Sequence, residues 1–122
     1  MNRPVFLNLM QIRMPVGAVT SIAHRVSGVL LALGVPFSAY IFDLSLQGPR
    51  SFERAQELLA GSMLKAAAIV FVWALAHHLL AGVRHLLSDI GVGSRLPFAR
   101  RSAWVVNGTG VFIALLAAWA LL

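Results

Sequence analysis

Two short stretches of the sequence carry side chains that could bind a carbonyl, a carboxylate or a metal. The first stretch contains four residues spaced for one face of a helix: Ser21, His24, Arg25 and Gly28. On a helix they fall within an arc of about 100°. A hydroxyl, an imidazole and a guanidinium on one face could together donate several hydrogen bonds to one ligand. Interfacial arginine and histidine side chains also extend to lipid headgroups without any ligand, and this alternative stays open.

The second stretch contains a stripe of residues at helical spacing: His78, Gly82, His85 and Asp89. The stripe is about 60° wide on a helix, and His78 lies roughly 10 Å along the axis from His85. We therefore expect His85 near the membrane surface and His78 deeper. A deep neutral imidazole can ligate haem iron, and Gly82 would let a flat macrocycle approach the backbone. Arg84 and His85 would then suit the anionic haem propionates.

Other readings of the second stretch stay open. His77 and His78 could hydrogen-bond a neighbouring helix, or either could belong to a proton path. His77 points about 100° away from His78, so only one of them can belong to the stripe, and the spacing favours His78. Asp89 could pair with Arg84 or Arg25 in an ion pair, or it could simply mark the end of the span.

A haem with two imidazole ligands needs a second histidine besides His78. His85 shares a helix with His78 and cannot reach round the ring. His24 is expected at a different depth in the membrane. The spacing therefore predicts that the second ligand comes from another chain.

The composition indicates a membrane protein. Of 122 residues, 59% are hydrophobic and 11% are charged, with a mean hydropathy of +0.82, whereas soluble domains carry about 25% charged residues. The net charge is +6, but the basic residues flank apolar runs, which is typical of topology information and not of nucleic-acid binding. The chain has no cysteine, which excludes disulfides, cysteine-ligated zinc, iron–sulfur clusters and thioether-linked haem in this chain.

The apolar runs predict an all-α integral membrane protein with one domain, 1–122. We expect an N-terminal cytoplasmic arm (1–20) and three transmembrane helices (21–46, 63–89 and 102–122), with a polar connector at 47–60 that contains a short helical turn. Thr20 and Ser21 are predicted N-cap residues of the first helix. Pro36 should kink that helix.

Arginines gather on the N-terminal side and around the loop between the second and third spans: Arg3, Arg13, Arg25, Arg84, Arg95, Arg100 and Arg101. The positive-inside rule then predicts that the N-terminus and this loop face the cytoplasm and that the C-terminus faces the periplasm. The two polar stretches therefore lie at the same end of the helices, where they can meet.

The residues of both stretches resemble a known family. RPVFLNLMQIRMPVGAVTSIAHRVSGVLL followed by HHLLAGVRHLLSDIG is similar to the cytochrome b subunit, the larger membrane anchor, of bacterial succinate dehydrogenase (respiratory complex II). The combination of S-x-x-H-R-x-[ST]-G with H-x-x-x-G-x-R-H-x-x-x-D carries the resemblance. It covers essentially the whole chain.

The resemblance implies roles for the site residues. Ser21 and Arg25 would bind the quinone, with His24 near both the quinone and a haem propionate. Arg25 and His85 would also lie at the haem edge. His78 would be the axial iron ligand.

The resemblance also implies the roles of two further residues. Asp89 matches the acidic residue that closes the second motif, where it could serve a proton or ion-pair role with Arg84. His77 stands where relatives carry an aromatic residue, so the adjacent histidines leave open which one is the ligand.

The resemblance implies one haem b, shared with a smaller anchor subunit that supplies the second axial histidine in a heterodimeric helical bundle. Electrons from succinate would reach ubiquinone through a flavoprotein and an iron–sulfur subunit, which links the tricarboxylic acid cycle to respiratory electron transport. The complex would lie in the bacterial inner membrane, with a trimer of heterotetramers left open. This chain itself would perform no dehydrogenation and bind neither flavin nor iron–sulfur cluster.

Two other functions stay open at the sequence level. The chain could anchor a quinol:fumarate reductase, which runs the reaction in the opposite direction. It could also be a haem-free membrane scaffold or transporter subunit in which the histidines relay protons or pack helices. Haem content distinguishes this last reading from the others.

Overall fold

The structure is a computed structural model that describes residues 14–122. Within this range the chain forms helices and no strand: α1 (Val16–Leu46), α2 (Pro49–Ala60), α3 (Ser62–Asp89) and α4 (Leu96–Leu121). Three of them, α1, α3 and α4, are long and apolar enough to cross a membrane. The predicted all-α fold with three membrane-spanning helices is confirmed.

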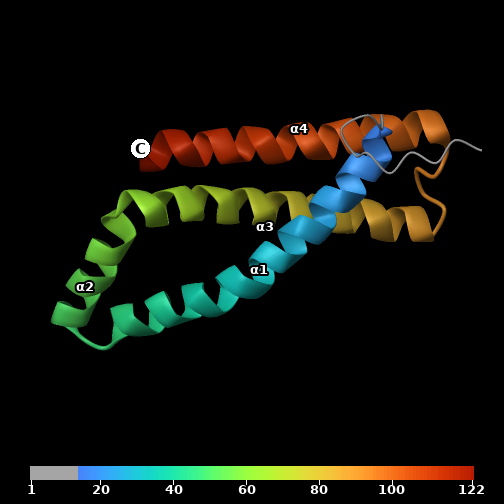
Figure 1. The fold of residues 1–122 in the computed structure, drawn as a ribbon. Coiled ribbons are helices and arrows are strands. Elements are labelled where there is room, and N and C mark those ends of the chain that lie inside the picture. The colour runs from blue at the N-terminus through green and yellow to red at the C-terminus, as the bar shows by residue number, and fades with distance from the viewer. Residues whose placement is uncertain (1–13) are drawn as a thin grey trace, which may run out of the picture.

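The three long helices form an antiparallel set in which α1 crosses α3. In Figure 1, α3 and α4 lie side by side along their length, and α1 passes across the second half of α3 before diverging from it. The start of α1 and the start of α4 lie at one end of the molecule, and the C-terminus lies at the other (Figure 1). The α1 ribbon bends along its course, and Pro36, inside this helix, removes a backbone hydrogen bond as predicted for a kink.

The helix starts differ from the expected span limits. Residues 1–13 of the predicted arm, with Arg3 and Arg13, lie outside the described residues, and the arm's last residues already belong to α1. The N-cap position is Pro15 and not Thr20 or Ser21, because the carbonyl of Pro15 accepts the first helical hydrogen bonds. The helix α4 likewise starts before residue 102, with a proline in its first turn, where a missing N–H costs nothing.

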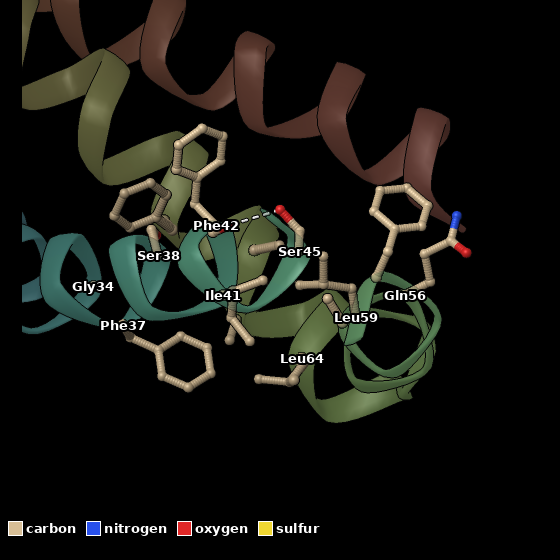
Figure 2. A pocket seen from close by; sticks show the side chains of 14 residues that line it. Gly34, Phe37, Ser38, Ile41, Phe42, Ser45, Gln56, Leu59 and Leu64 are labelled. Atoms are coloured by element: carbon tan, nitrogen blue, oxygen red, sulfur yellow. Dashed lines mark hydrogen bonds between the residues drawn. The ribbon is translucent and has the colours of Figure 1, made fainter. Parts of the chain in front are cut away.

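The connector is a longer helix than predicted. The whole of α2, 12 residues, is helical, with Pro49 at its first turn. Its apolar side, including Phe52 and Leu59, faces a cleft of about 520 Å³ between α1 and α3 (Figure 2). None of the residues lining this cleft belongs to the two polar stretches, because the cleft lies toward the opposite end of α1.

The packing of the long helices is the reverse of that in a soluble protein. The buried positions of α1, α3 and α4 are mostly small or polar: Thr20, Ser27, Ile41, Ala74, His77, Ala81, Ala103, Val106 and Gly110. Large apolar side chains point outward instead, such as Leu33 and Trp119 at 70% and 84% exposure. Small side chains allow helices to approach closely in lipid, where burying apolar surface gives no advantage. Hydrogen bonds between the small and polar residues of the interior can therefore determine how the helices pack.

Away from the histidines, α1 also comes close to α3 at Gly34. A Cβ at this position would lie 2.5 Å from the Phe71 ring. Real Cβ atoms essentially never come that close, so any larger residue here would force the Phe71 ring or one of the helices to move. This contact and the His24–His78 contact together define the path of α1 across α3.

Gly34→Ala is expected to destabilise the membrane subunit by about 1–3 kcal/mol, because the added methyl group forces the Phe71 ring or the helix to move. Gly108→Ala is the matched control, since a Cβ there meets no atom within 4 Å. Thermal unfolding of the detergent-solubilised protein measures both variants. Equal stabilities for the two variants would contradict the close approach at Gly34.

Candidate functional site

The two predicted polar stretches meet where α1 crosses α3. The imidazole rings of His24 and His78 are stacked, with centroids 4.1 Å apart and planes inclined by 9°. Both side chains are partly buried between the helices. The structure thus brings together one residue from each stretch at a single point.

The His78 ring is held by hydrogen bonds from one of its two nitrogens. His78 Nδ1 lies 3.0 Å from the backbone carbonyl oxygen of His24 and 3.2 Å from Ser27 Oγ. Ser27 Oγ itself donates to the same carbonyl at 2.8 Å. A carbonyl oxygen only accepts, so His78 Nδ1 carries the proton and Nε2 keeps its lone pair. Nε2 forms no hydrogen bond within residues 14–122, which is the arrangement that prepares an imidazole to bind a metal.

Two glycines leave the room that the stacked rings occupy. A Cβ at Gly28 would lie 3.1 Å from His78 Cε1, which is tighter than most real contacts. A Cβ at Gly82 would lie 3.7 Å from His24 Nε2, an ordinary contact. The glycine gap predicted on the first face is therefore filled by His78 itself.

The expectation that His24 and His78 lie at different depths is wrong. Because α1 crosses α3 obliquely, the two histidines reach the same point although each was placed by counting along its own helix. His24 still does not suit the second axial position. Its ring is stacked on that of His78 at 4.1 Å, which leaves no room for a haem between the two rings.

The remaining residues of the first stretch are exposed near the start of α1. Ser21 and Arg25 are both exposed, and neither forms a side-chain hydrogen bond within the described part of the chain. They lie beside His24 in sequence and at the end of the molecule where α4 also begins. Their side chains are free to contact a ligand or a partner subunit.

The polar side chains after Gly82 point either to the surface or to α4. His85 and Asp89 remain exposed, with His85 Nε2 3.9 Å from Asp89 Oδ2. Arg84 turns to α4, where Nε donates to Ser102 Oγ at 3.0 Å and Nη2 donates to the carbonyl of Ala99 at 3.0 Å.

The structure shows no pairing of Asp89 with Arg84 or Arg25 within residues 14–122, where Arg84 faces α4 and Asp89 lies near His85, so this pairing stays a prediction. The role of Arg84 at the haem propionates also stays a prediction, although two of its guanidinium nitrogens already bond to α4. The proton role of Asp89 stays a prediction.

The second of the adjacent histidines is a packing residue. His77 is only 1% exposed, and its Nε2 lies 3.0 Å from Asn107 Oδ1 on α4. The open alternative of a hydrogen bond to a neighbouring helix thus describes His77, and His78 keeps the free nitrogen. The geometry favours the same histidine as the spacing did.

Three residues of the polar interior form contacts that were not predicted from the sequence: Thr20, Ser27 and Asn107. Ser27 occupies the serine-or-threonine position of the first motif, which could have indicated a hydrogen-bonding role. Asn107 stands out as a polar side chain within an apolar span. The sequence does not predict the partners, because Thr20 and Asn107 are 87 positions apart and Ser27 and His78 are 51 positions apart.

The available side-chain donors fit a metal that is already coordinated by a porphyrin. Residues 14–122 contain no group of three or more His, Cys, Asp or Glu side chains that could hold a metal ion. One imidazole with a fixed ring and a free Nε2 is instead what a porphyrin iron requires from one side. The residues present therefore fit haem with one ligand from this chain.

Comparison with known proteins places the chain in a family. Residues 1–122 match the family described as succinate dehydrogenase/fumarate reductase transmembrane subunit. The chain belongs to this family. The resemblance to the cytochrome b membrane subunit of succinate dehydrogenase, predicted from the two motifs, is confirmed.

Named members of the succinate dehydrogenase/fumarate reductase transmembrane subunit family align over most of the chain. The succinate dehydrogenase cytochrome b556 subunit of Coxiella burnetii is 36% identical over 85% of this chain and 84% of its own length. That of Paracoccus denitrificans is 31% identical over 94% and 88%. The mitochondrial cytochrome b560 subunit of Sus scrofa is 33% identical over 86% of this chain and 63% of its own length.

Arg84→Gln is expected to lower the free energy of unfolding by about 1–3 kcal/mol, because it removes charge-assisted hydrogen bonds between α3 and α4. Arg100→Gln, exposed and without a side-chain hydrogen bond in the described residues, is the control. Unfolding of the detergent-solubilised protein measures both. A loss as large in Arg100→Gln as in Arg84→Gln would show that charge, and not the two bonds, sets the stability.

Proposed function

We propose that this chain binds one haem b through His78 and forms part of the ubiquinone-reducing site of a succinate dehydrogenase complex. The observation that carries the proposal is the hydrogen bonding of His78. Its Nδ1–H is held by the His24 carbonyl at 3.0 Å, which leaves Nε2 for iron. The names of the relatives, cytochrome b556 and b560 subunits, support a haem of the b type.

The chain's residues would hold the haem from one side. His78 would supply one axial nitrogen, with the ring orientation fixed by the His24 carbonyl and by Ser27. His24, Arg25 and His85 would lie at the haem edge and interact with the propionates. A bound haem b would supply a reversible one-electron carrier. The second axial histidine would come from a smaller anchor subunit, because His24 and His85 are both unsuitable.

The quinone headgroup would bind beside His24 at the start of α1. Ser21 and Arg25 are exposed there, so a hydroxyl and a guanidinium can donate hydrogen bonds to a quinone carbonyl. Reduction of ubiquinone to ubiquinol takes up two electrons and two protons, and negative charge develops on the carbonyl oxygens. Donors aimed at that charge lower the barrier. Protons would come from water at the same end, where His85 and Asp89 are exposed.

The distribution of arginines supports one orientation of this chain in the membrane. The arginines near the start of α1 and between α3 and α4 would face the cytoplasm of a bacterium, with the C-terminus in the periplasm. The quinone site then faces an iron–sulfur subunit, which passes on electrons that a flavoprotein takes from succinate. The outward apolar side chains of the three long helices would contact lipid and the smaller anchor subunit.

His78→Ala is expected to abolish the low-spin b-type signal in a reduced-minus-oxidised spectrum of the purified complex, reduced with succinate alone. Leu79→Ala, an exposed neighbour at 63%, should keep the signal and serves as the control. Subunit content is measured on the same samples to detect misassembly. An unchanged haem spectrum and midpoint potential in an assembled His78→Ala complex would rule out His78 as the ligand.

Arg25→Leu is expected to lower succinate:quinone reductase activity by roughly 100-fold, the typical cost of losing one donor to a developing negative charge. Succinate oxidation with a soluble dye acceptor should remain intact, because this acceptor does not use the quinone site. Arg50→Leu, on exposed α2 at the other end, is the control. Loss of both activities in Arg25→Leu would indicate misassembly, and full quinone reductase activity would exclude Arg25 from the site.

A further inference from the structure

A second polar cluster joins all three long helices close to the stacked histidines. Thr20 on α1, His77 on α3 and Asn107 on α4 meet around one oxygen atom. Asn107 Oδ1 lies 3.1 Å from Thr20 Oγ1 and 3.0 Å from His77 Nε2. Thr20 and His77 are almost fully buried, at 2% and 1% exposure. We call this the Thr20–His77–Asn107 cluster.

The acceptor Asn107 Oδ1 determines which nitrogen of His77 carries the hydrogen. A carbonyl oxygen has two lone pairs and accepts two hydrogen bonds. His77 must therefore present Nε2–H, which leaves Nδ1 as an acceptor, and Nδ1 is the one buried side-chain polar atom in residues 14–122 without a partner. The Thr20 hydroxyl has one hydrogen, which it can donate either to Asn107 Oδ1 at 3.1 Å or to the carbonyl of Val16 at 2.9 Å. Leaving these groups unpaired in an apolar interior would be costly, so they hold the helices together.

The Thr20–His77–Asn107 cluster and the His24–His78 contact hold α3 on two different faces. His77 and His78 are adjacent, so their side chains leave α3 about 100° apart. His77 is bound to α4, and His78 is bound to α1. A rotation of α3 about its axis cannot keep both bonds. On α1, Thr20 and His24 are one turn apart, so the same turn carries both attachments.

We propose that the Thr20–His77–Asn107 cluster is a positioning device that fixes the rotation of α3 and the start of α1, and so sets the orientation of the His78 imidazole. The proposal rests on the proposed function in that His78 is taken as the iron ligand. Thr20, His77 and Asn107 are positioning residues, since none of them needs to touch haem or quinone.

The packing around His77 supports a fixed and not an adaptable contact. A Cβ at Gly110 would meet His77 Cβ at 3.4 Å and Trp73 Nε1 at 3.5 Å, so α4 runs close against α3 at this point. The Trp73 and His77 rings lie 5.3 Å apart. Ala74 and Ala103 are fully buried in the same interface. With α3 and α4 packed this closely, the Thr20 hydroxyl adds a bond from α1 to α4 beside the bond from the His24 carbonyl to α3.

The experiment compares variants of Thr20 in the purified complex with all its subunits. Thr20→Val keeps the shape and removes the hydroxyl, and Thr20→Ser keeps the hydroxyl. Asn107→Leu removes the shared acceptor, and Thr109→Val is the control on α4, since Thr109 has no side-chain hydrogen bond in the described residues. Each variant is examined by electron paramagnetic resonance of the oxidised haem, which responds to the orientation of axial imidazoles, and by midpoint potential at full haem content.

Thr20→Val and Asn107→Leu are expected to shift the low-spin haem resonance and the midpoint potential, while Thr20→Ser and Thr109→Val leave both unchanged. The Thr20→Val/Asn107→Leu double variant should shift them no further than Asn107→Leu alone, because both changes break the same bond. Wild-type resonance and potential in Thr20→Val at full haem content would overturn the proposal.

A second readout does not depend on haem. The ¹⁵N resonance of His78 Nδ1 in histidine-labelled protein, reduced so that any haem is diamagnetic, reports the hydrogen bond to the His24 carbonyl. It should move in Thr20→Val and not in Thr20→Ser. If the wild-type complex contains no haem, the proposed function fails, but this resonance still decides whether the cluster orients His78. An unmoved resonance in Thr20→Val overturns the positioning role in either case.

Discussion

The structure depends on one backbone carbonyl, that of His24. It lies within the helix α1, yet it also accepts a hydrogen bond from His78 Nδ1 at 3.0 Å and one from Ser27 Oγ at 2.8 Å. Residues 54 positions apart in sequence, on two different helices, are thereby joined through a backbone atom that no side-chain substitution at residue 24 can remove. The same bond selects the tautomer of His78, and the tautomer decides which nitrogen is free. Fold and candidate function therefore rest on the same contact.

The lipid environment explains why polar groups can have so large a part. In water the burial of large apolar side chains holds helices together, whereas in this chain side chains such as Leu33 and Leu115 point outward, at 70% and 63% exposure. Between the helices lie alanine, glycine, serine, threonine and histidine, which give close approach and a few hydrogen bonds. Each bond is modest, about 0.6 kcal/mol on average in membrane proteins. Their value lies in choosing one rotation of each helix among many that pack equally well.

The sequence was sufficient to predict what depends on local spacing. Hydropathy predicted three long apolar helices, and the two motifs placed His24, Gly28 and His78 where they are needed. It was insufficient for contacts that depend on the crossing of helices. Counting along each helix put His24 and His78 at different depths, because depth was taken along parallel axes. Arg84 was assigned with its sequence neighbours, although its guanidinium turns to α4 and binds Ser102.

The division of His77 and His78 between two partners shows how adjacent residues of one type can serve different ends. A single histidine would leave α3 hydrogen-bonded through its histidine on one side only. With His77 bound to α4 and His78 bound to α1, the rotation is fixed by two bonds about 100° apart. The orientation of the His78 ring can then be set before any partner subunit arrives. In the proposed complex a partner would approach the Nε2 side of His78, where residues 14–122 offer no second ligand.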